Sequence, residues 1–409
     1  MGPNLHFIRL SLRLIFERMG LLAMFRSLIL GILLLSPLLG LTQIELSRSA
    51  KVSVLTCSEG PELHAAFGHT ALHVFDPGNG IDQVYNFGTF DFEAPNFYLN
   101  FIKGKLDYFV SVSTYSDFSR YYNYVGRSVV RQELNLNRNQ RQEVFEALVH
   151  NAKPENKYYR YDFLTENCAT KIPEILSIGL GESLSISTHL DAQNLTYRST
   201  IQEHLSRFSW ERFGIDLVLG ARVDQPLKGA ELAYLPIYLE QLLAESTLTQ
   251  QPLVTRTILE IPKKYERIEA SFLSSPLFLI SLLVLYALLS LWFAKTAKVY
   301  AFVDSALLLI AGGAGLLLTF LNFFSEHYAT AVNFSIFWAN PLLIFALIAR
   351  SKTLYQTVAV LSLLIFLLSL FGIQHFSVEL LLCGLLIILL TAKKGAFDIH
   401  NSVKPAKHV

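Results

Sequence analysis

The sequence predicts a mixed α+β globular domain followed by an all-helical membrane region. Hydrophobic residues make up 52% of the 409 residues and charged residues only 16%, against about 25% charged residues in soluble proteins. The hydrophobicity is uneven, because five long apolar runs all follow residue 274. Between residues 45 and 272 the composition is ordinary, and Gly, Pro and Asn turns separate short segments typical of strands and helices.

The N-terminal segment, residues 1–44, contains one apolar run, Leu28–Leu41, which follows Arg26 and is interrupted by Pro37. Its 14 residues suit the core of a signal peptide better than a full span, which needs about 20. No small-x-small cleavage site is obvious, so we expect either a signal peptide or an uncleaved anchor. Met24 is a candidate for the true start of translation.

Residues 45–272 are predicted to form the folded domain, and their charges exclude one class of partner. Between Glu45 and Glu269 there are 28 acidic and 22 basic residues. Because no basic stripe suited to a phosphate backbone occurs, we expect no nucleic-acid partner. The segment also lacks an HExxH motif, a Cys-x-x-Cys pair and a phosphate-binding glycine loop, so no metal or cofactor is expected.

Residues 273–392 are predicted to form five transmembrane helices. Each apolar run is near the roughly 17–25 residues that a bilayer helix needs, and the runs are Pro276–Ala294, Val299–Phe324, Val332–Ala349, Tyr355–Phe371 and Phe376–Ala392. Lys or Arg follows the first, third and fifth runs, whereas the other two loops have neither. By the positive-inside rule, the tail at 393–409 is cytoplasmic and residues 45–272 lie on the opposite, exported side.

Polar residues inside or beside these runs allow two interpretations. Asp304 and Glu379 lie near the ends of their runs, where we expect them to reach the membrane interface rather than to act within the bilayer. A second group either lines a cavity on the exported side or belongs to an interfacial aromatic belt. Its members are His327, Asn333, Trp338 and Asn340.

Within the folded domain, Thr70–Phe75 and Gln83–Phe87 are predicted to form an antiparallel hairpin around the turn at 76–80. Asn137, three residues before Gln140, has the pattern of a capping box at a helix start. Asn167 is predicted to cap a helix that begins at Cys168. Pro173 is too deep for the first turn of such a helix, so we expect a kink or a restart there.

His69 and Cys168 are the candidate catalytic residues. A thiol is nucleophilic as the thiolate, which a helix N-terminus favours, and a neighbouring imidazole can accept its proton. The fold can bring the two together although they are far apart in sequence. Two alternatives stay open: Cys168 is a buried structural thiol, or it forms a bridge with Cys57.

Asn86 is the candidate third member. A hairpin turn near Gly78 and Asn79 places it close to His69 on the same face of the sheet. Its side-chain carbonyl can accept the imidazole N–H and fix the tautomer. Gly88 would let the backbone approach the site closely. The backbone N–H of Cys168 is the natural oxyanion donor, with Tyr161 as a helper.

The segment from Tyr85 to Tyr124 contains 14 aromatic residues in 40. One interpretation is an ordinary aromatic core. The other is a surface that enters the membrane interface, where amphipathic rings are favoured.

Four stretches resemble a known family when they are taken together. They read LTCSEGPELHAAFGHTALHVFDP, DQVYNFGTFDFEAPNFYLNFIKGKLDYFV, YRYDFLTENCATKI and FGIDLVLG. They are similar to lipoprotein N-acyltransferases of the Bacteroidota type (Lnb), a former domain-of-unknown-function family. The resemblance covers about Leu55 to Leu239, and a multi-span C-terminal region is also typical of the family. The order of His before Cys further resembles permuted papain-like enzymes of the NlpC and lecithin:retinol acyltransferase (LRAT) type.

The resemblance implies a permuted papain-like (NlpC/LRAT-like) α+β domain in the periplasm, held in the bacterial inner membrane by a multi-pass bundle. It implies that Cys168 is the nucleophile and His69 the base. The implied reaction moves an acyl chain from a membrane phospholipid, through a cysteine thioester, to the α-amino group of the diacylglyceryl-cysteine of a lipoprotein. The implied partners are the phospholipid donor, the diacylated lipoprotein and the membrane, without a cofactor.

Other functions remain open at this stage. One is a membrane-anchored cell-wall peptidase or amidase of the NlpC type, which would use the same Cys/His pair. Another is a non-enzymatic periplasmic interaction module that a Cys57–Cys168 bridge holds closed. A phospholipase, with water as the acceptor, is the nearest variant of the acyltransferase.

Overall fold

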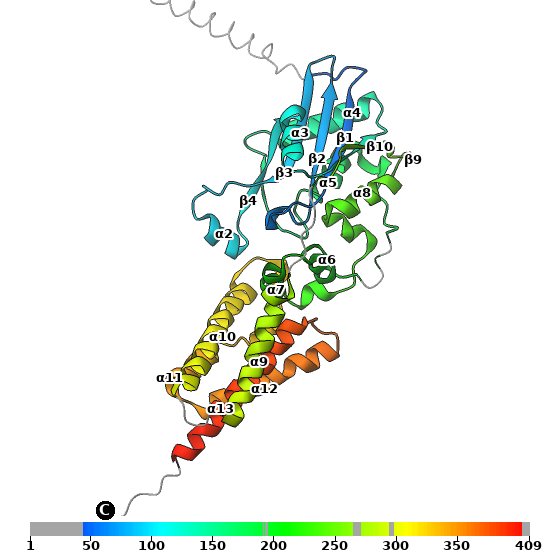
Figure 1. Ribbon diagram of the computed structural model, residues 1–409. Coiled ribbons are helices and arrows are strands. Elements are labelled where there is room, and N and C mark those ends of the chain that lie inside the picture. The colour runs from blue at the N-terminus through cyan, green and yellow to red at the C-terminus, as the bar shows by residue number, and fades with distance from the viewer. Residues whose placement is uncertain (1–43, 191, 193–194, 265–270, 294–297, 403–409) are drawn as a thin grey trace, which may run out of the picture. The chain divides into compact units, whose positions relative to one another are not determined.

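The structure is a computed structural model that describes residues 44–190, 192, 195–264, 271–293 and 298–402 (Figure 1). The predicted N-terminal apolar run and the end of the C-terminal tail lie outside the described residues. The strands are β1 (Lys51–Cys57), β2 (His69–Asp76), β3 (Ile81–Thr89), β4 (Asp107–Thr114), β5 (Val129–Leu134), β6 (Tyr158–Arg160), β7 (Leu184–Ser185), β8 (Thr247–Leu248), β9 (Gln251–Pro252) and β10 (Val254–Ile261). The α-helices are α2 (Phe97–Lys103), α3 (Tyr115–Tyr124), α4 (Arg138–Asn151), α5 (Lys171–Leu180), α6 (Tyr197–His204), α7 (Ser209–Val218), α8 (Pro236–Glu245), α9 (Pro276–Phe293), α10 (Lys298–Phe324), α11 (Leu342–Ala349), α12 (Lys352–Leu370) and α13 (Val378–Ser402).

The N-terminal domain is built on a seven-stranded sheet within the described ranges. Its strand order is β10-β5-β1-β2-β3-β4-β6, and each neighbouring pair is antiparallel. An α+β domain followed by apolar helices was predicted, and this coarse class is confirmed. The relation to permuted papain-like enzymes stays a prediction.

The central strand β1 is buried from Val52 to Cys57 because both faces of the sheet are covered. On one face, Phe118 and Tyr122 of α3 pack in the same cluster as Leu55 and Cys57. On the other face, Gln132, which is paired with Val54, donates from Nε2 to the Glu240 carbonyl of α8 at 2.9 Å. The packing on both faces therefore fixes which face of the sheet each side chain of β1 and of its neighbour β2 occupies.

The predicted hairpin is present as β2 and β3, with Ala71 opposite Asn86 and Asp76 opposite Ile81. His73 lies on the same face as His69 but has a structural role. Its Nε2 is 2.7 Å from Asp82 Oδ1, its Nδ1 is 2.6 Å from Arg131 Nη1, and its ring stacks on Tyr115.

The predicted capping box is also present at the start of α4. The Asn137 side chain accepts from the Gln140 backbone N–H at 3.0 Å, and the Gln140 side chain accepts from the Asn137 backbone N–H at 2.9 Å.

The apolar helices of the C-terminal domain correct one prediction. Within the described residues, Val299–Phe324 and Lys352–Leu370 are long and apolar enough to cross a membrane, and Pro276–Leu291 and Phe334–Ala349 are shorter apolar segments. The run Val332–Ala349 is not one helix, because a 3-10 turn at Phe334–Phe337 precedes α11. Helix α11 begins just after Pro341. The Asn340 side chain, on the other side of this proline, accepts the Leu342 N–H at 3.0 Å.

The two carboxylates within the apolar runs are both buried and ion-paired. Asp304 is buried, with Oδ2 2.9 Å from Lys393 Nζ. Glu379 is also buried, and its Oε1 lies 3.1 Å from Arg212 Nη2 of α7.

A cavity of about 380 Å³ lies beside the end of α10. Of the four residues considered for such a cavity, Asn333 lines it and the other three do not. Trp338 is buried, which also argues against an interfacial belt at that position. The cavity combines Asn333 with the exposed Arg222 and with aromatic side chains such as Phe337.

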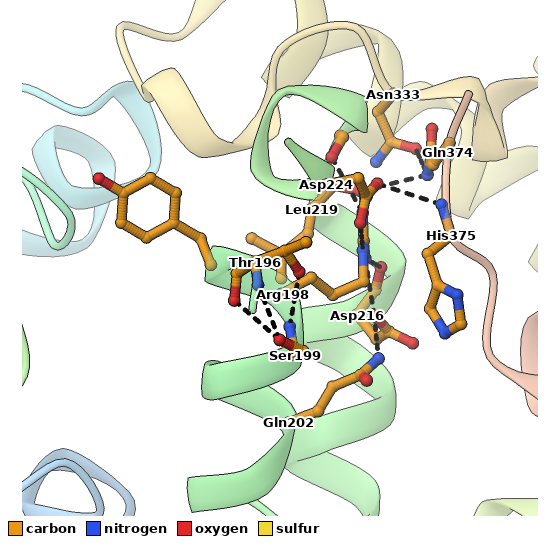
Figure 2. Close-up of polar contacts among 12 residues, drawn as sticks. Thr196, Arg198, Ser199, Gln202, Asp216, Leu219, Asp224, Asn333, Gln374 and His375 are labelled. Atoms are coloured by element: carbon orange, nitrogen blue, oxygen red, sulfur yellow. Dashed lines mark hydrogen bonds and ion pairs between the residues drawn. The ribbon is translucent and has the colours of Figure 1, made fainter. Parts of the chain in front are cut away.

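Arg198 of α6 is the centre of a polar network that joins the two domains (Figure 2). Its side chain is 1% exposed, and it forms ion pairs with Asp216 at 2.7 Å and with Asp224 at 2.6 Å. Asp224 Oδ2 also accepts the His375 backbone N–H at 3.1 Å, and Asn333 Nδ2 donates to the Leu217 carbonyl at 2.8 Å. The loops between the apolar helices are thus bonded to the N-terminal domain.

Candidate active site

The site lies where β2 and β3 separate. Their ladder ends at the pair Ala71 and Asn86, and β3 is irregular between Asn86 and Thr89, where its pairing with β4 shifts. The next residues on β2, Thr70 and His69, therefore have no partner on β3. A gap in the hydrogen-bond ladder leaves backbone groups available to another segment.

Cys168 occupies this gap. A backbone N–H of Thr70 bonds its sulfur. On the other side, a Cβ built on Gly88 would lie 3.5 Å from the Cys168 Cβ and 3.7 Å from its backbone nitrogen. The expected close approach of Gly88 is therefore present, but those distances are ordinary contacts. Glycine is needed at this position because φ is +83°, in the left-handed region.

His69 and Asn86 are in contact, as the predicted register requires. His69 Nε2 lies 3.3 Å from Asn86 Oδ1. The Asn86 amide nitrogen donates to Val84 O and to Ser113 Oγ, each at 3.3 Å. These two bonds orient the amide so that its oxygen faces the imidazole. His69 Nε2 therefore carries the proton, and Nδ1 has the free lone pair.

Gly68 fixes the position at which His69 enters β2. Its φ is +82°, and a Cβ there would come within 2.7 Å of the Cys57 carbonyl oxygen. A side chain would therefore clash with the backbone of β1, where Cys57 is the cross-strand partner of His69. This close contact explains why a glycine stands directly before His69 in the sequence.

The segment around Cys168 is held by Asn167, although the helix begins later than predicted. Asn167 Oδ1 accepts from the backbone N–H groups of Ala169 and Thr170 at 2.8 and 3.0 Å. Its Nδ2 donates to Phe163 O and Tyr234 O. The helix α5 starts at Lys171, so Cys168 lies in the turn that precedes it. Pro173 is consequently in the first turn, where its missing N–H costs nothing, and no restart is seen.

At neutral pH the pKa shifts favour the uncharged forms of the Cys168 thiol and the His69 imidazole, two residues that are each partly buried. Burial raises the pKa of Cys168 above its ordinary value, although the backbone N–H groups of Thr70, Cys168 and Ala169 oppose the rise. Burial lowers the pKa of His69 to about 4, and the charge of Arg127 adds to this, against the hydrogen bond from Asn86. The expected thiolate at a helix N-terminus is therefore not the resting state, because burial outweighs the local dipoles.

The structure contains no Cys57–Cys168 bridge, because both cysteines are free. Cys57 is buried in the sheet and contacts Tyr122 of α3, and burial raises its pKa to about 12. Its environment is that of a structural thiol.

Two residues near Cys168 were not predicted. The Tyr159 hydroxyl is buried beside the Gly88 backbone and has no hydrogen-bond partner of normal geometry within the described residues. Arg127 is buried, and its charge acts on both His69 and Cys168. The predicted helper Tyr161 is partly buried near Cys168 and stacks on Tyr108 with ring centres 3.9 Å apart. Neither Tyr159 nor Arg127 belongs to a spaced motif, so only the aromatic composition around Tyr159 could have suggested it.

Within the described ranges, no group of three or more His, Cys, Asp or Glu side chains is placed to hold a metal ion. The chemistry available here is that of a thiol, an imidazole and an amide at a break in a β-ladder. Such an arrangement can form and resolve a covalent acyl intermediate.

The arrangement is that of a membrane protein in which a candidate thiol–imidazole site lies on an α+β domain outside the helical region. Residues 42–203 match the Lnb N-terminal periplasmic domain, and residues 267–397 match the Lnb transmembrane domain. The chain therefore belongs to the Lnb family, and His69, Asn86 and Cys168 all lie within the first match. No curated protein and no solved structure matches the chain significantly.

Proposed function

We propose that this protein is a lipoprotein N-acyltransferase of the inner membrane, with its catalytic domain in the periplasm and its C-terminus in the cytoplasm. Two contacts support the proposal: the Cys168 sulfur is bonded by the backbone N–H of Thr70, the residue after His69, and His69 contacts Asn86. Both lie in a periplasmic domain of the Lnb family that is joined to a transmembrane domain. Under the positive-inside rule, the alternation of basic and non-basic loops between the apolar runs supports this orientation.

In the first half-reaction, Cys168 attacks the carbonyl carbon of a phospholipid ester. His69 Nδ1 takes the thiol proton as the C–S bond forms, and it returns that proton to the departing alcohol oxygen as the C–O bond breaks. The products are a thioester on Cys168 and a lysophospholipid. A neutral imidazole at the start is what a general base requires.

In the second half-reaction, the free α-amino group of a diacylglyceryl-cysteine attacks the thioester. His69 takes a proton from the attacking nitrogen and returns it to the sulfur as the C–S bond breaks. The products are the amide of the triacylated lipoprotein and the original thiol. A thioester reacts readily with amines, so this route needs no nucleoside triphosphate.

Both tetrahedral intermediates carry a negative oxygen that needs hydrogen-bond donors. The backbone N–H of Cys168 and the hydroxyl of Tyr159 are the candidates for this role. The Tyr159 hydroxyl is a candidate because it is buried beside the Gly88 backbone and has no hydrogen-bond partner of normal geometry within the described residues.

Lipid substrates are supported by the surface of α2. This helix exposes apolar side chains, with Tyr98 72% and Phe101 49% exposed. Its C-terminal end bonds the loop after α10, since Lys103 O accepts the Glu326 N–H at 2.9 Å and Phe101 O lies 2.7 Å from His327 Nε2. An apolar helix at the end of a membrane helix suits the headgroup region. Substrates held there react at high effective concentration and away from water.

The test is a Cys168→Ala variant expressed in cells that carry a model lipoprotein and lack any other N-acyltransferase. Mass spectrometry of that lipoprotein is expected to show the triacylated form with the wild-type protein and only the diacylated form with the variant. Cys383→Ala, a cysteine change in α13, is the matched control and is expected to keep the activity.

Three results would overturn the proposal. Triacylation by a folded Cys168→Ala variant would remove the nucleophile. Release of free fatty acid without transfer to the lipoprotein would indicate a phospholipase. Cleavage of muropeptides independent of phospholipid would indicate a cell-wall peptidase or amidase.

A further inference from the structure

Arg127 is a buried cation without a carboxylate partner. Its side chain is 5% exposed and lies between α3 and β5. Nε donates to the Ser58 carbonyl at 2.7 Å, and the guanidinium lies 5.1 Å from the ring centre of Tyr122. Within the described part of the chain, Nη2 has no hydrogen-bond partner and no Asp or Glu forms an ion pair with this residue.

An unpaired charge in such a position is costly to fold. Arginine cannot lose its proton to avoid the cost, and buried charges are normally paired. Arg198, the other arginine that is buried among the described residues, follows that rule, because Asp216 and Asp224 neutralise it. The contrast indicates that Arg127 serves to stabilise negative charge that is absent from the resting protein and arises during the reaction.

The position of Arg127 connects it to the candidate active site. Ser58, whose carbonyl it binds, follows Cys57, and Cys57 is the cross-strand partner of His69. Tyr122, over which the guanidinium lies, contacts Cys57 on the face of the sheet that carries His69. Arg127 is therefore close enough for its charge to act on both His69 and Cys168.

The other groups around the pair carry no competing charge at neutral pH. Cys57 on β1 and Tyr122 on α3 are buried, whereas Tyr159 of β6 and the neighbouring Tyr161 are partly buried. All four are uncharged, because burial raises the pKa of each. On the segment that carries Cys168, Lys171 forms ion pairs with Glu166 at 2.6 Å and with Glu174 at 2.7 Å. None of these neighbours carries a negative charge that would neutralise Arg127.

We infer that Arg127 is a positioning residue of the thiol–imidazole pair, whose buried charge adds to burial in disfavouring a protonated His69 and stabilises negative charge on the Cys168 sulfur. Both effects have one origin, because a fixed cation disfavours a second positive charge and favours a negative one. The inference rests on the proposed function for its catalytic meaning, but the charge states can be measured without lipid or lipoprotein.

The test is the rate at which iodoacetamide alkylates Cys168 in the full chain in detergent micelles, followed by mass spectrometry of the Cys168 peptide between pH 6 and 10. Arg127→Met removes the charge, and we expect the midpoint of the pH profile to rise by about one unit. That change means alkylation about tenfold slower at pH 8. Arg127→Lys keeps the charge and is expected to keep most of the rate.

The controls separate charge from structure. Arg120→Met removes an exposed arginine that pairs with Asp117 on the same helix as Tyr122, and it should leave the profile unchanged. If Arg127→Met does not fold, Arg127→Gln compared with Arg127→Lys gives the same contrast.

An unchanged profile in folded Arg127→Met or Arg127→Gln would overturn the inference. Equal loss in the charged and uncharged variants would overturn it too, because the bond to Ser58 would then be the cause. If Arg127→Met shows the expected rise in the midpoint of the alkylation profile but the wild-type protein transfers no acyl chain, only the proposed function would be contradicted.

Discussion

Replacing Asn86 by Asp tests whether this residue is the partner of the catalytic imidazole. The change converts a neutral oxygen 3.3 Å from His69 Nε2 into a carboxylate. Two unit charges at that distance attract by about 5 kcal/mol at an effective dielectric constant of about 20, which corresponds to about 3.7 pKa units. Desolvation of the new carboxylate opposes part of this effect. We therefore expect the pKa of His69 to rise by about two units from its value of about 4.

The sign of the effect on activity follows from the role of the base. His69 acts only when it is unprotonated, so activity is lost as the pH falls through its pKa in the folded protein. Wild-type kcat/KM for acyl transfer should be flat down to about pH 5 and fall below about pH 4. In Asn86→Asp it should fall below about pH 6, so that activity at pH 5 is about a tenth of that at pH 7.5.

The assay is acyl transfer from phospholipid vesicles to a diacylated lipopeptide, with each variant compared with its own value at pH 7.5. Asp82→Asn is the matched control, because Asp82 lies 2.7 Å from the other histidine on this face, His73. It should leave the acid limb of the profile in place. An Asn86→Asp enzyme that is active and has the wild-type profile would refute the assignment of Asn86.

Three further predictions follow from the site, the network and the surface of α2. Tyr159→Phe should lower kcat by about 10²-fold with little change in KM, as the loss of an oxyanion donor does, and equal kcat values would exclude the hydroxyl from that role. Arg198→Met should destabilise the protein by about 3–5 kcal/mol in denaturant unfolding, because it leaves two carboxylates in the interior without a countercharge, whereas Lys51→Met, at an exposed ion pair, should cost less than about 1 kcal/mol. Tyr98→Asp with Phe101→Asp should slow acyl transfer from vesicles while leaving alkylation of Cys168 unchanged, and unchanged transfer would contradict a membrane-facing α2.

The hairpin and the contact between His69 and Asn86 could be predicted because both depend on local pattern. Alternation and a Gly/Asn turn define the two strands, and the length of the turn sets the register. The register places Ala71 opposite Asn86, so His69 reaches Asn86 diagonally on the same face.

The start of α5 could not be predicted to the residue. Asn167 has the pattern of an N-cap, and its side chain does accept two backbone N–H groups. A turn of three residues nevertheless precedes the helix, and sequence does not distinguish these two uses of the same side chain. The interrupted run at 332–349 did carry a signal, since Asn340 and Pro341 are helix-start residues inside an apolar segment.

The charge states and Arg127 depend on tertiary burial, which no local pattern shows. The predicted helix start at Cys168 made an activated thiol one of three interpretations of this residue, but burial of the site decides the sign of its pKa shift. Arg127 is one arginine between α3 and β5, without a spacing that marks it. Its importance becomes visible only when its buried environment and its missing partner are known.

The central claim is that an acyl chain passes through the sulfur of Cys168, and the most direct test is to trap that intermediate. The full chain in detergent is incubated with phospholipid and no amine acceptor, and its peptides are analysed by mass spectrometry. We predict an acyl adduct on Cys168 that hydroxylamine removes and that disappears when a diacylated lipopeptide is added. An enzyme that transfers acyl chains while Cys168 stays unmodified, or an adduct on another residue that is consumed instead, would contradict the account.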